Sequence, residues 1–213
     1  MNAVGSRPVD DSVGDRRDEA GRLLRCGALV GLLVFVAIVL VEHGVRSELS
    51  PASHQISEYA NGPHGWLMTL AFSAWAVSLV CAAGVLRPWP GWRPVGVALL
   101  IAAAGIGLVA AFHTQTVAGQ LPPGQALRTG GMLHDIGSGA ATVSLFAGAL
   151  LSLRPGGTVL RRWTVALLTL AVVTDVVLLA LGSEVGGIRE RILVGAGCAW
   201  EGVVIARGKP SVT

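Results

Sequence analysis

Histidine and carboxylate residues of the kind that bind metal ions or transfer protons occur together in short stretches of the chain. The first stretch holds His54, Ser57 and Glu58, which would share one face of a helix because they are three and four residues apart. A histidine and a carboxylate so placed could bind a divalent metal or act as an acid and base pair. Local pairing and helix capping is the alternative interpretation of the same spacing.

The second stretch is His134 followed directly by Asp135, while Asp175 stands alone in a later apolar run. Neighbours on a helix point about 100° apart, so His134 and Asp135 would not both address one ion squarely. Ionisable groups at membrane depth are costly and usually face a polar interior, which favours Asp135 and Asp175 over the loop acids as site residues. A structural hydrogen-bond network is the alternative.

Charged residues also open the last apolar run, as Arg189, Glu190 and Arg191. The two arginines could pair with Glu184 or Asp175, or hold lipid phosphates. A solvated charge cluster is the alternative. Glu201, further along the same run, is expected to reach the interface at the other end of the helix.

Six apolar runs must position these residues. A helix that crosses a membrane needs about 20 mainly apolar residues. The runs span residues 26–43, 65–86, 95–112, 131–153, 163–182 and 188–206. The sequence therefore predicts an all-α polytopic membrane bundle of six transmembrane helices over residues 25–207. Residues 1–24 are predicted to form a disordered cytoplasmic tail, and residues 208–213 a short cytoplasmic one.

The loop after the first run is predicted to contain a short interfacial helix. Ser50 suits the cap of this helix, Pro51 its first position, and Asn61, Gly62 and Pro63 its end. Within the first run, Gly27 and Gly31 have the four-residue spacing that allows two helices to approach closely.

Composition supports the membrane interpretation, because 52% of the 213 residues are hydrophobic and only 14% are charged. The basic residues are spread over tails and loops, so nucleic acid is not an expected partner. The three cysteines fall in three separate runs, which favours neither a disulfide framework nor a paired-cysteine metal motif.

The arginine distribution predicts the orientation, since Lys and Arg are retained in cytoplasmic loops. Assigning the loops alternately places twelve basic residues on the side of the two termini and four on the other: Arg46, Arg128, Arg189 and Arg191. Both termini are therefore expected in the cytoplasm. All five histidines then fall at the outer ends of the helices, namely His43, His54, His64, His113 and His134.

Several short motifs follow one another in a recognisable order. They are Ile56-Ser57-Glu58-Tyr59-Ala60, Gly65-Trp66-Leu67-Met68, residues 129–134, and residues 187–191 with Trp200. Over roughly residues 27–206 the chain resembles a six-helix bacterial and archaeal membrane family known as domain of unknown function 998. The resemblance implies the six-helix fold and a role for Ser57, Glu58, Tyr59 and His134. The chain has His113-Thr114-Gln115 where family members often have proline, threonine and aspartate.

Two functions fit these observations. One is an enzyme that acts on a lipid or isoprenoid at the outer leaflet, with a divalent metal or with acids and bases alone. Its catalytic residues would come from His54, Ser57, Glu58, Tyr59, His134, Asp135, Asp175 and Arg191. The other is a non-catalytic lipid-binding, transport-related or structural membrane component. Membrane lipid is the expected partner in both.

Overall fold

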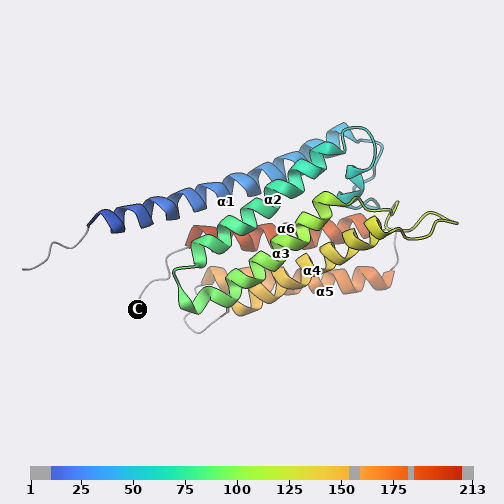
Figure 1. Cartoon of the computed structure of the whole chain (residues 1–213). Helices are drawn as coiled ribbons and strands as arrows, with labels where there is room; N and C mark the ends of the chain where they lie inside the picture. The colour runs from blue at the N-terminus through green and yellow to red at the C-terminus, as the bar shows by residue number, and fades with distance from the viewer. Residues whose placement is uncertain (1–10, 154–158, 182–184, 208–213) are drawn as a thin grey trace, which may run out of the picture.

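The protein is all-helical, and the computed structural model describes residues 11–153, 159–181 and 185–207. Within these residues, six α-helices run back and forth along one long axis (Figure 1). They are α1 (Asp11–Val45), α2 (Trp66–Leu86), α3 (Arg93–Ala111), α4 (Thr129–Leu151), α5 (Val159–Leu181) and α6 (Gly186–Arg207). Two short 3₁₀ helices, η1 (Ile56–Ala60) and η2 (Pro90–Trp92), lie in the connections before α2 and α3. The six helices fall on the six apolar runs of the sequence.

Three of these helices are long and apolar enough to cross a membrane: Asp18–Val45, Trp66–Leu86 and Pro90–Ala111. The remaining helices have similar lengths of 22 or 23 residues. They also carry ionisable groups along their length, His134 and Asp135 in α4, Asp175 in α5 and Glu201 in α6, which reduce their apolar character.

The first helix begins well before its apolar stretch. Residues 11–24, which were predicted to belong to a disordered tail, form the first turns of α1 and join its apolar part without a break. Once the apolar part of a helix has formed, each added residue gains a backbone hydrogen bond without a new nucleus, so a helix extends readily into polar sequence. Residues 1–10 and 208–213 lie outside the described residues.

The predicted interfacial helix is shorter than expected. Ser50 accepts a hydrogen bond from the Ala52 amide as a cap would, but Gln55 is extended and the helical turn covers only Ile56–Ala60. All five residues of η1 are buried, so it packs inside the protein and not along a membrane surface. The expected end is confirmed, because Asn61 follows the helix and Gly62 has a φ of 104°.

Small residues set how closely the helices approach. A Cβ atom on Gly31 would lie 2.6 Å from the Ala74 carbonyl oxygen, so the glycine pair of α1 packs against α2. Gly105 of α3 and Gly137 of α4 face each other in the same way, since a Cβ on either would lie within 2.6 Å of the other's carbonyl oxygen. Such contacts are typical of helices that pack within lipid.

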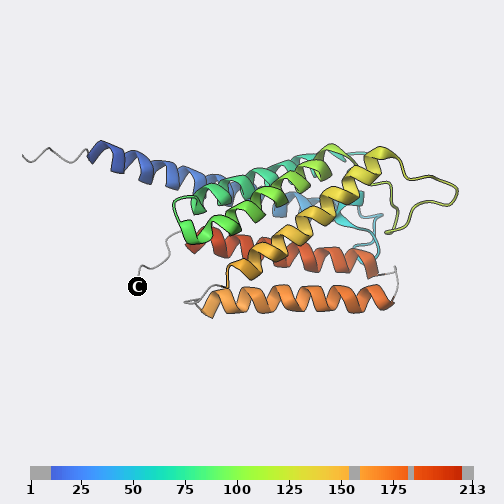
Figure 2. The same ribbon diagram turned by 60° about the horizontal axis from the view of Figure 1, so that its bottom comes forward.

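The bundle has two chemically different ends. The histidine end holds residues 46–65, residues 112–128 and the start of α6, and the arginine end holds the start of α1, residues 87–92 and the end of α6. Figure 2 shows that α4 diverges from α5 towards the histidine end, while α5 and α6 stay side by side. The diverging region between α4 and the α5–α6 pair is called the wedge, and residues of all three helices line a cavity there.

Candidate functional site

Arg191 of α6 joins three parts of the histidine end. Its Nε donates to His43 Nε2 of α1 at 2.9 Å, and its Nη1 donates to the carbonyl oxygens of His54 and Gly187 at 2.7 and 2.9 Å. Its Nη2 donates to the Tyr59 hydroxyl at 3.2 Å. With every nitrogen of the guanidinium engaged by the protein, Arg191 acts as a positioning residue.

Glycine at position 187 allows this contact. A Cβ there would lie 2.4 Å from the His54 carbonyl oxygen and 2.5 Å from that of Pro51. The Ile188 amide donates to the Ala52 carbonyl oxygen at 3.2 Å, so the first loop covers the start of α6 and satisfies an amide that lacks a partner within the helix.

Tyr59 is the buried centre of the first loop, with 1% of its surface exposed. Its hydroxyl donates to the Leu49 carbonyl oxygen at 3.1 Å while it accepts from Arg191. Burial raises the pKa of the Tyr59 hydroxyl, and the neighbouring Arg191 charge opposes that shift. A neutral hydroxyl held at both sides is suited to holding the loop.

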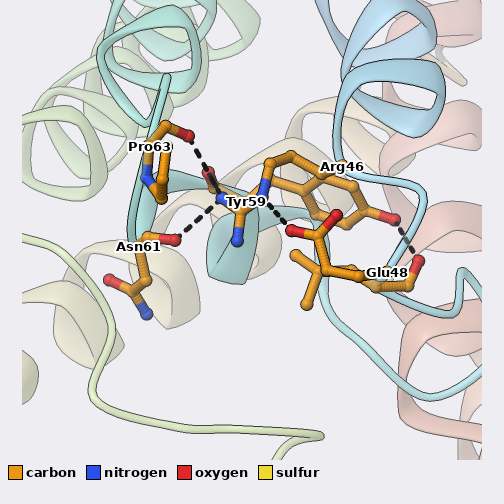
Figure 3. Close-up of polar contacts among 6 residues, drawn as sticks. Arg46, Glu48, Tyr59, Asn61 and Pro63 are labelled. Atoms are coloured by element: carbon orange, nitrogen blue, oxygen red, sulfur yellow. Dashed lines mark hydrogen bonds and ion pairs between the residues drawn. The ribbon is translucent and has the colours of Figure 1, made fainter.

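Arg46 fixes the turn that follows Tyr59 (Figure 3). Its Nη1 donates to the carbonyl oxygens of Tyr59, Asn61 and Pro63 at 3.3, 2.8 and 3.5 Å. Its Nε donates to Glu48 at 2.5 Å, and this hydrogen bond lowers the pKa of the exposed Glu48 carboxyl. The carbonyl oxygens of this turn have no partner in a helix or sheet, and the Arg46 side chain supplies their hydrogen-bond donor.

Glu58 holds the second loop, residues 112–128, rather than facing His54. Its carboxylate accepts from the amides of Ala118 and Gly119 at 2.9 and 2.8 Å and from the Thr116 hydroxyl at 3.2 Å. Ala118 and Gly119 both have positive φ, at 50° and 73°, so their amides point together as an anion-binding nest. The carboxylate that seemed available for catalysis is committed to backbone amides.

Beneath the two loops, the wedge between α4 and the α5–α6 pair contains a cavity of about 270 Å³. Polar residues line the part nearest the histidine end: Gln55, Ser57, His134, Asp135, Ser138, Asp175, Arg189 and Glu190. Mainly apolar residues line the rest, with Thr142 among them: Phe72, Trp75, Leu145, Phe146, Leu168, Val172, Leu193 and Val194. Ile106 and Val109, near the end of α3, lie beside the polar groups. The cavity therefore has a polar end near the loops and a mainly apolar remainder.

Four of the polar groups on the cavity have defined partners. His134 is buried, and its Nδ1 lies 2.7 Å from the Phe112 carbonyl oxygen, which places the ring proton on Nδ1. Arg189 donates to Asp175 at 2.7 Å. Glu190 accepts a hydrogen bond from the Ile56 amide of η1. Carboxylates therefore outnumber the single guanidinium on this lining.

The predicted site residues separate into two groups. Ser57, His134, Asp135 and Asp175 line the cavity, whereas Glu58, Tyr59 and Arg191 hold the loops that cover it. His54 is not on a face with Glu58, because η1 begins only at Ile56; its Nδ1 lies 3.2 Å from the Ser53 hydroxyl. Glu184, a predicted arginine partner, lies outside the described residues.

Arg189, Glu190 and Gln55 line the cavity but are not among the predicted catalytic residues. The charged triplet before the last apolar run was visible in the sequence, but its pairing with α5 and η1 requires the folded arrangement. Within the described ranges, no group of three or more His, Cys, Asp or Glu side chains is close enough to hold a metal ion. His54 and Glu58, the pair proposed to bind a divalent metal, therefore form no such group with His134 or Asp135.

Comparison with known proteins places the chain in a family whose activity is not known. The family described as protein of unknown function (DUF998) matches residues 29–207. No curated protein and no solved structure matches the chain.

Proposed function

We propose that this chain, which belongs to the DUF998 family, is a membrane protein that binds an amphiphilic lipid or isoprenoid in the cavity beneath its two loops. One observation carries the proposal: a single cavity has hydrogen-bonding and charged groups at one end and aliphatic and aromatic side chains along the rest. This division matches a ligand with a polar head and an apolar chain, because each part meets groups of its own kind.

The proposal includes six membrane crossings with both termini in the cytoplasm. Support comes from large apolar side chains that point outward on the less apolar helices, such as Val143 of α4, 69% exposed, and Leu170 of α5, 61% exposed. Such residues favour a lipid surround. The excess of arginine at one end supports the orientation. Thiol labelling in intact cells tests it: Ala126→Cys should react with an impermeant reagent and Pro88→Cys should not.

The wedge supplies a route for the ligand. We propose that the cavity opens to the side of the bundle, since α4 packs along α3 while α5 packs along α6, and exposed apolar residues such as Val143 and Leu170 lie elsewhere on α4 and α5. A volume of about 270 Å³ is just below the roughly 300 Å³ at which small-molecule pockets begin. One chain of an amphiphile fits this size better than a whole two-chain lipid.

The charges on the lining favour a particular head group. Among the described lining residues, Asp135, Asp175 and Glu190 outnumber the one arginine, Arg189, which is already paired with Asp175, although Arg191 also acts electrostatically on Glu190. A phosphate head would therefore meet more carboxylates than guanidinium groups. A hydroxyl or amine head would donate hydrogen bonds to the carboxylates, so we assign the cavity to an amphiphile of that class.

Mass spectrometry of the purified full chain tests this function. Ser138→Phe places a large ring in the cavity from an exposed position on α4, while Val143→Phe places the same ring on the lipid-facing side of the same helix. A single-chain amphiphile should co-purify with the wild type and with Val143→Phe, and be lost from Ser138→Phe. Equal retention of lipid by all three proteins would refute the cavity as its site.

A second candidate function is acid and base chemistry on the bound amphiphile. It is favoured by the His134 imidazole, held by the Phe112 carbonyl oxygen, on the same cavity as Asp135 and Glu190. Once the co-purifying compound is known, His134→Gln separates the two functions. A catalyst would lose turnover of the compound while keeping it bound, whereas a binding protein would show no turnover in either form.

A further inference from the structure

A second hollow lies at the arginine end, between α2 and α3, and is separate from the cavity. Its volume is about 530 Å³. The hollow follows α2 from Arg87 back to Val80 and α3 from Arg93 forward to Leu100. Each path is seven residues long, so this groove reaches about 10 Å along the bundle.

The floor of the groove consists of small or buried residues and its walls are apolar. Ala83, Leu86 and Gly96 are buried, while Val97 and Leu100 of α3 stand about half exposed at its edge. A Cβ on Gly96 would approach nothing closer than the Ala83 carbonyl oxygen, at 3.7 Å. The glycine therefore leaves open space that an aliphatic chain can occupy.

The mouth of the groove is positively charged. Arg87 and Arg93 are both exposed and line it, together with Trp92. Nothing in the sequence from Tyr59 to His134 is acidic, so neither helix nor their connection supplies a counter-ion. Among the described residues no carboxylate pairs with either arginine.

We propose that this groove binds one anionic phospholipid, with its phosphate between Arg87 and Arg93 and an acyl chain over Ala83 and Gly96. Guanidinium groups bind phosphate through paired hydrogen bonds, and basic pockets between membrane helices select anionic lipid head groups. A zwitterionic lipid gains less, because its own cation is repelled by the same two arginines. In the proposed orientation this lipid lies in the cytoplasmic leaflet, where anionic lipids are concentrated.

Native mass spectrometry of the full chain, titrated with phosphatidylglycerol or phosphatidylcholine, measures this binding. The wild type should bind phosphatidylglycerol more tightly than phosphatidylcholine, and glycerophosphate should not compete. Arg87→Gln and Arg93→Gln should each weaken phosphatidylglycerol binding about fivefold, and the double variant about 25-fold, from roughly 1 kcal/mol for each basic residue at an anionic lipid surface. Arg128→Gln, an exposed arginine at the opposite end, should leave it unchanged.

A second pair of variants tests the apolar part of the groove. Gly96→Leu should fill it and weaken binding with both arginines in place, whereas Gly107→Leu, on the same helix with no neighbour within 4 Å, should not. Equal affinity for the two lipids, or competition by glycerophosphate, would overturn the proposal. If Gly96→Leu fails to fold, the variants of the exposed Arg87 and Arg93 still test the proposal. Full phosphatidylglycerol binding by the double Arg87→Gln, Arg93→Gln variant would overturn it.

Discussion

The Nε atom of Arg191 donates a hydrogen bond to Nε2 of His43, and this contact joins the last helix to the first across 148 residues of sequence. His43 Nε2 can accept because Nδ1, which lies 2.5 Å from the Val39 carbonyl oxygen, carries the ring proton and donates it in a hydrogen bond to that oxygen. The same guanidinium reaches the His54 carbonyl oxygen and the Tyr59 hydroxyl. One side chain therefore sets the position of the loop that covers the cavity.

Arg191→Lys should destabilise the protein although it preserves the charge. A lysine ammonium cannot reproduce the forked set of donors, so two or more charged hydrogen bonds are lost, at about 3 kcal/mol in total. Thermal unfolding of the purified protein should show a lower Tm. Arg128→Lys, which changes an exposed arginine, is the matched control, and an equal effect of both variants would contradict the role of Arg191.

Glu58→Gln should loosen the second loop without altering the helices. The Ala118 and Gly119 amides each donate a hydrogen bond to one carboxylate oxygen of Glu58. In glutamine an NH₂ group replaces one of these oxygens, so one of the two backbone amides loses its acceptor. Hydrogen exchange at these two amides should quicken about tenfold, equivalent to about 1.4 kcal/mol. Glu48→Gln, at an exposed carboxyl of the first loop, should leave their exchange unchanged. Unchanged exchange in Glu58→Gln would contradict the assignment.

Tyr59 should ionise only above the usual tyrosine pKa of 10.0, because burial raises its pKa. A raised pKa means that the folded protein holds the proton more tightly than the unfolded chain. The contribution of Tyr59 to stability is therefore complete below pH 10 and is lost as the pH rises through the folded pKa. The chain has one tyrosine, so tyrosinate absorbance reports Tyr59 alone. A midpoint no higher in the folded than in the denatured protein would contradict this.

Gly105→Ala should separate α3 from α4, since the added methyl would lie 2.5 Å from the Gly137 carbonyl oxygen. We expect a loss of about 1–3 kcal/mol, the usual result of overpacking against backbone. Gly107→Ala on the same helix meets nothing within 4 Å and should be neutral or slightly stabilising, because alanine favours helix over glycine. Thermal unfolding of both variants measures the difference, and equal Tm values would refute the close contact.

Glu201→Gln should be tolerated where Glu201→Leu is not. Glu201 is 0% exposed, so the expectation that it reaches an interface is wrong. Its carboxyl lies 2.6 Å from the Ser78 hydroxyl and 2.9 Å from Trp75 Nε1, and Ser78 Oγ is also 2.6 Å from the Ala28 carbonyl oxygen. Glutamine can keep these contacts and leucine cannot. Leucine would leave Trp75 Nε1 without an acceptor and remove one partner of the Ser78 hydroxyl, and we expect this to lower the free energy of unfolding by about 1–3 kcal/mol. Equal Tm values for the two variants would contradict this.

The helices and the gathering of histidines at one end could be predicted because hydropathy and charge along the chain carry that information directly. The roles of individual side chains could not. The spacing of His54 and Glu58 suggested a shared helical face, but Gln55 is extended and separates them. Glu58 accepts hydrogen bonds from the Ala118 and Gly119 amides, 60 and 61 residues away. The positive φ values of these two residues cannot be predicted from the local sequence. Partners so distant in sequence are set only by the packing of the bundle.

The divergence of α4 from α5 bears on how a ligand would reach the protein. With the proposed sideways opening into the bilayer, the cavity would take its ligand from the membrane and not from water, so its occupancy would follow the mole fraction of the amphiphile in the membrane. A ligand that is poorly soluble in water would then still reach the cavity. Dilution with inert lipid at constant bulk concentration would empty the site, a response that a site facing water does not show.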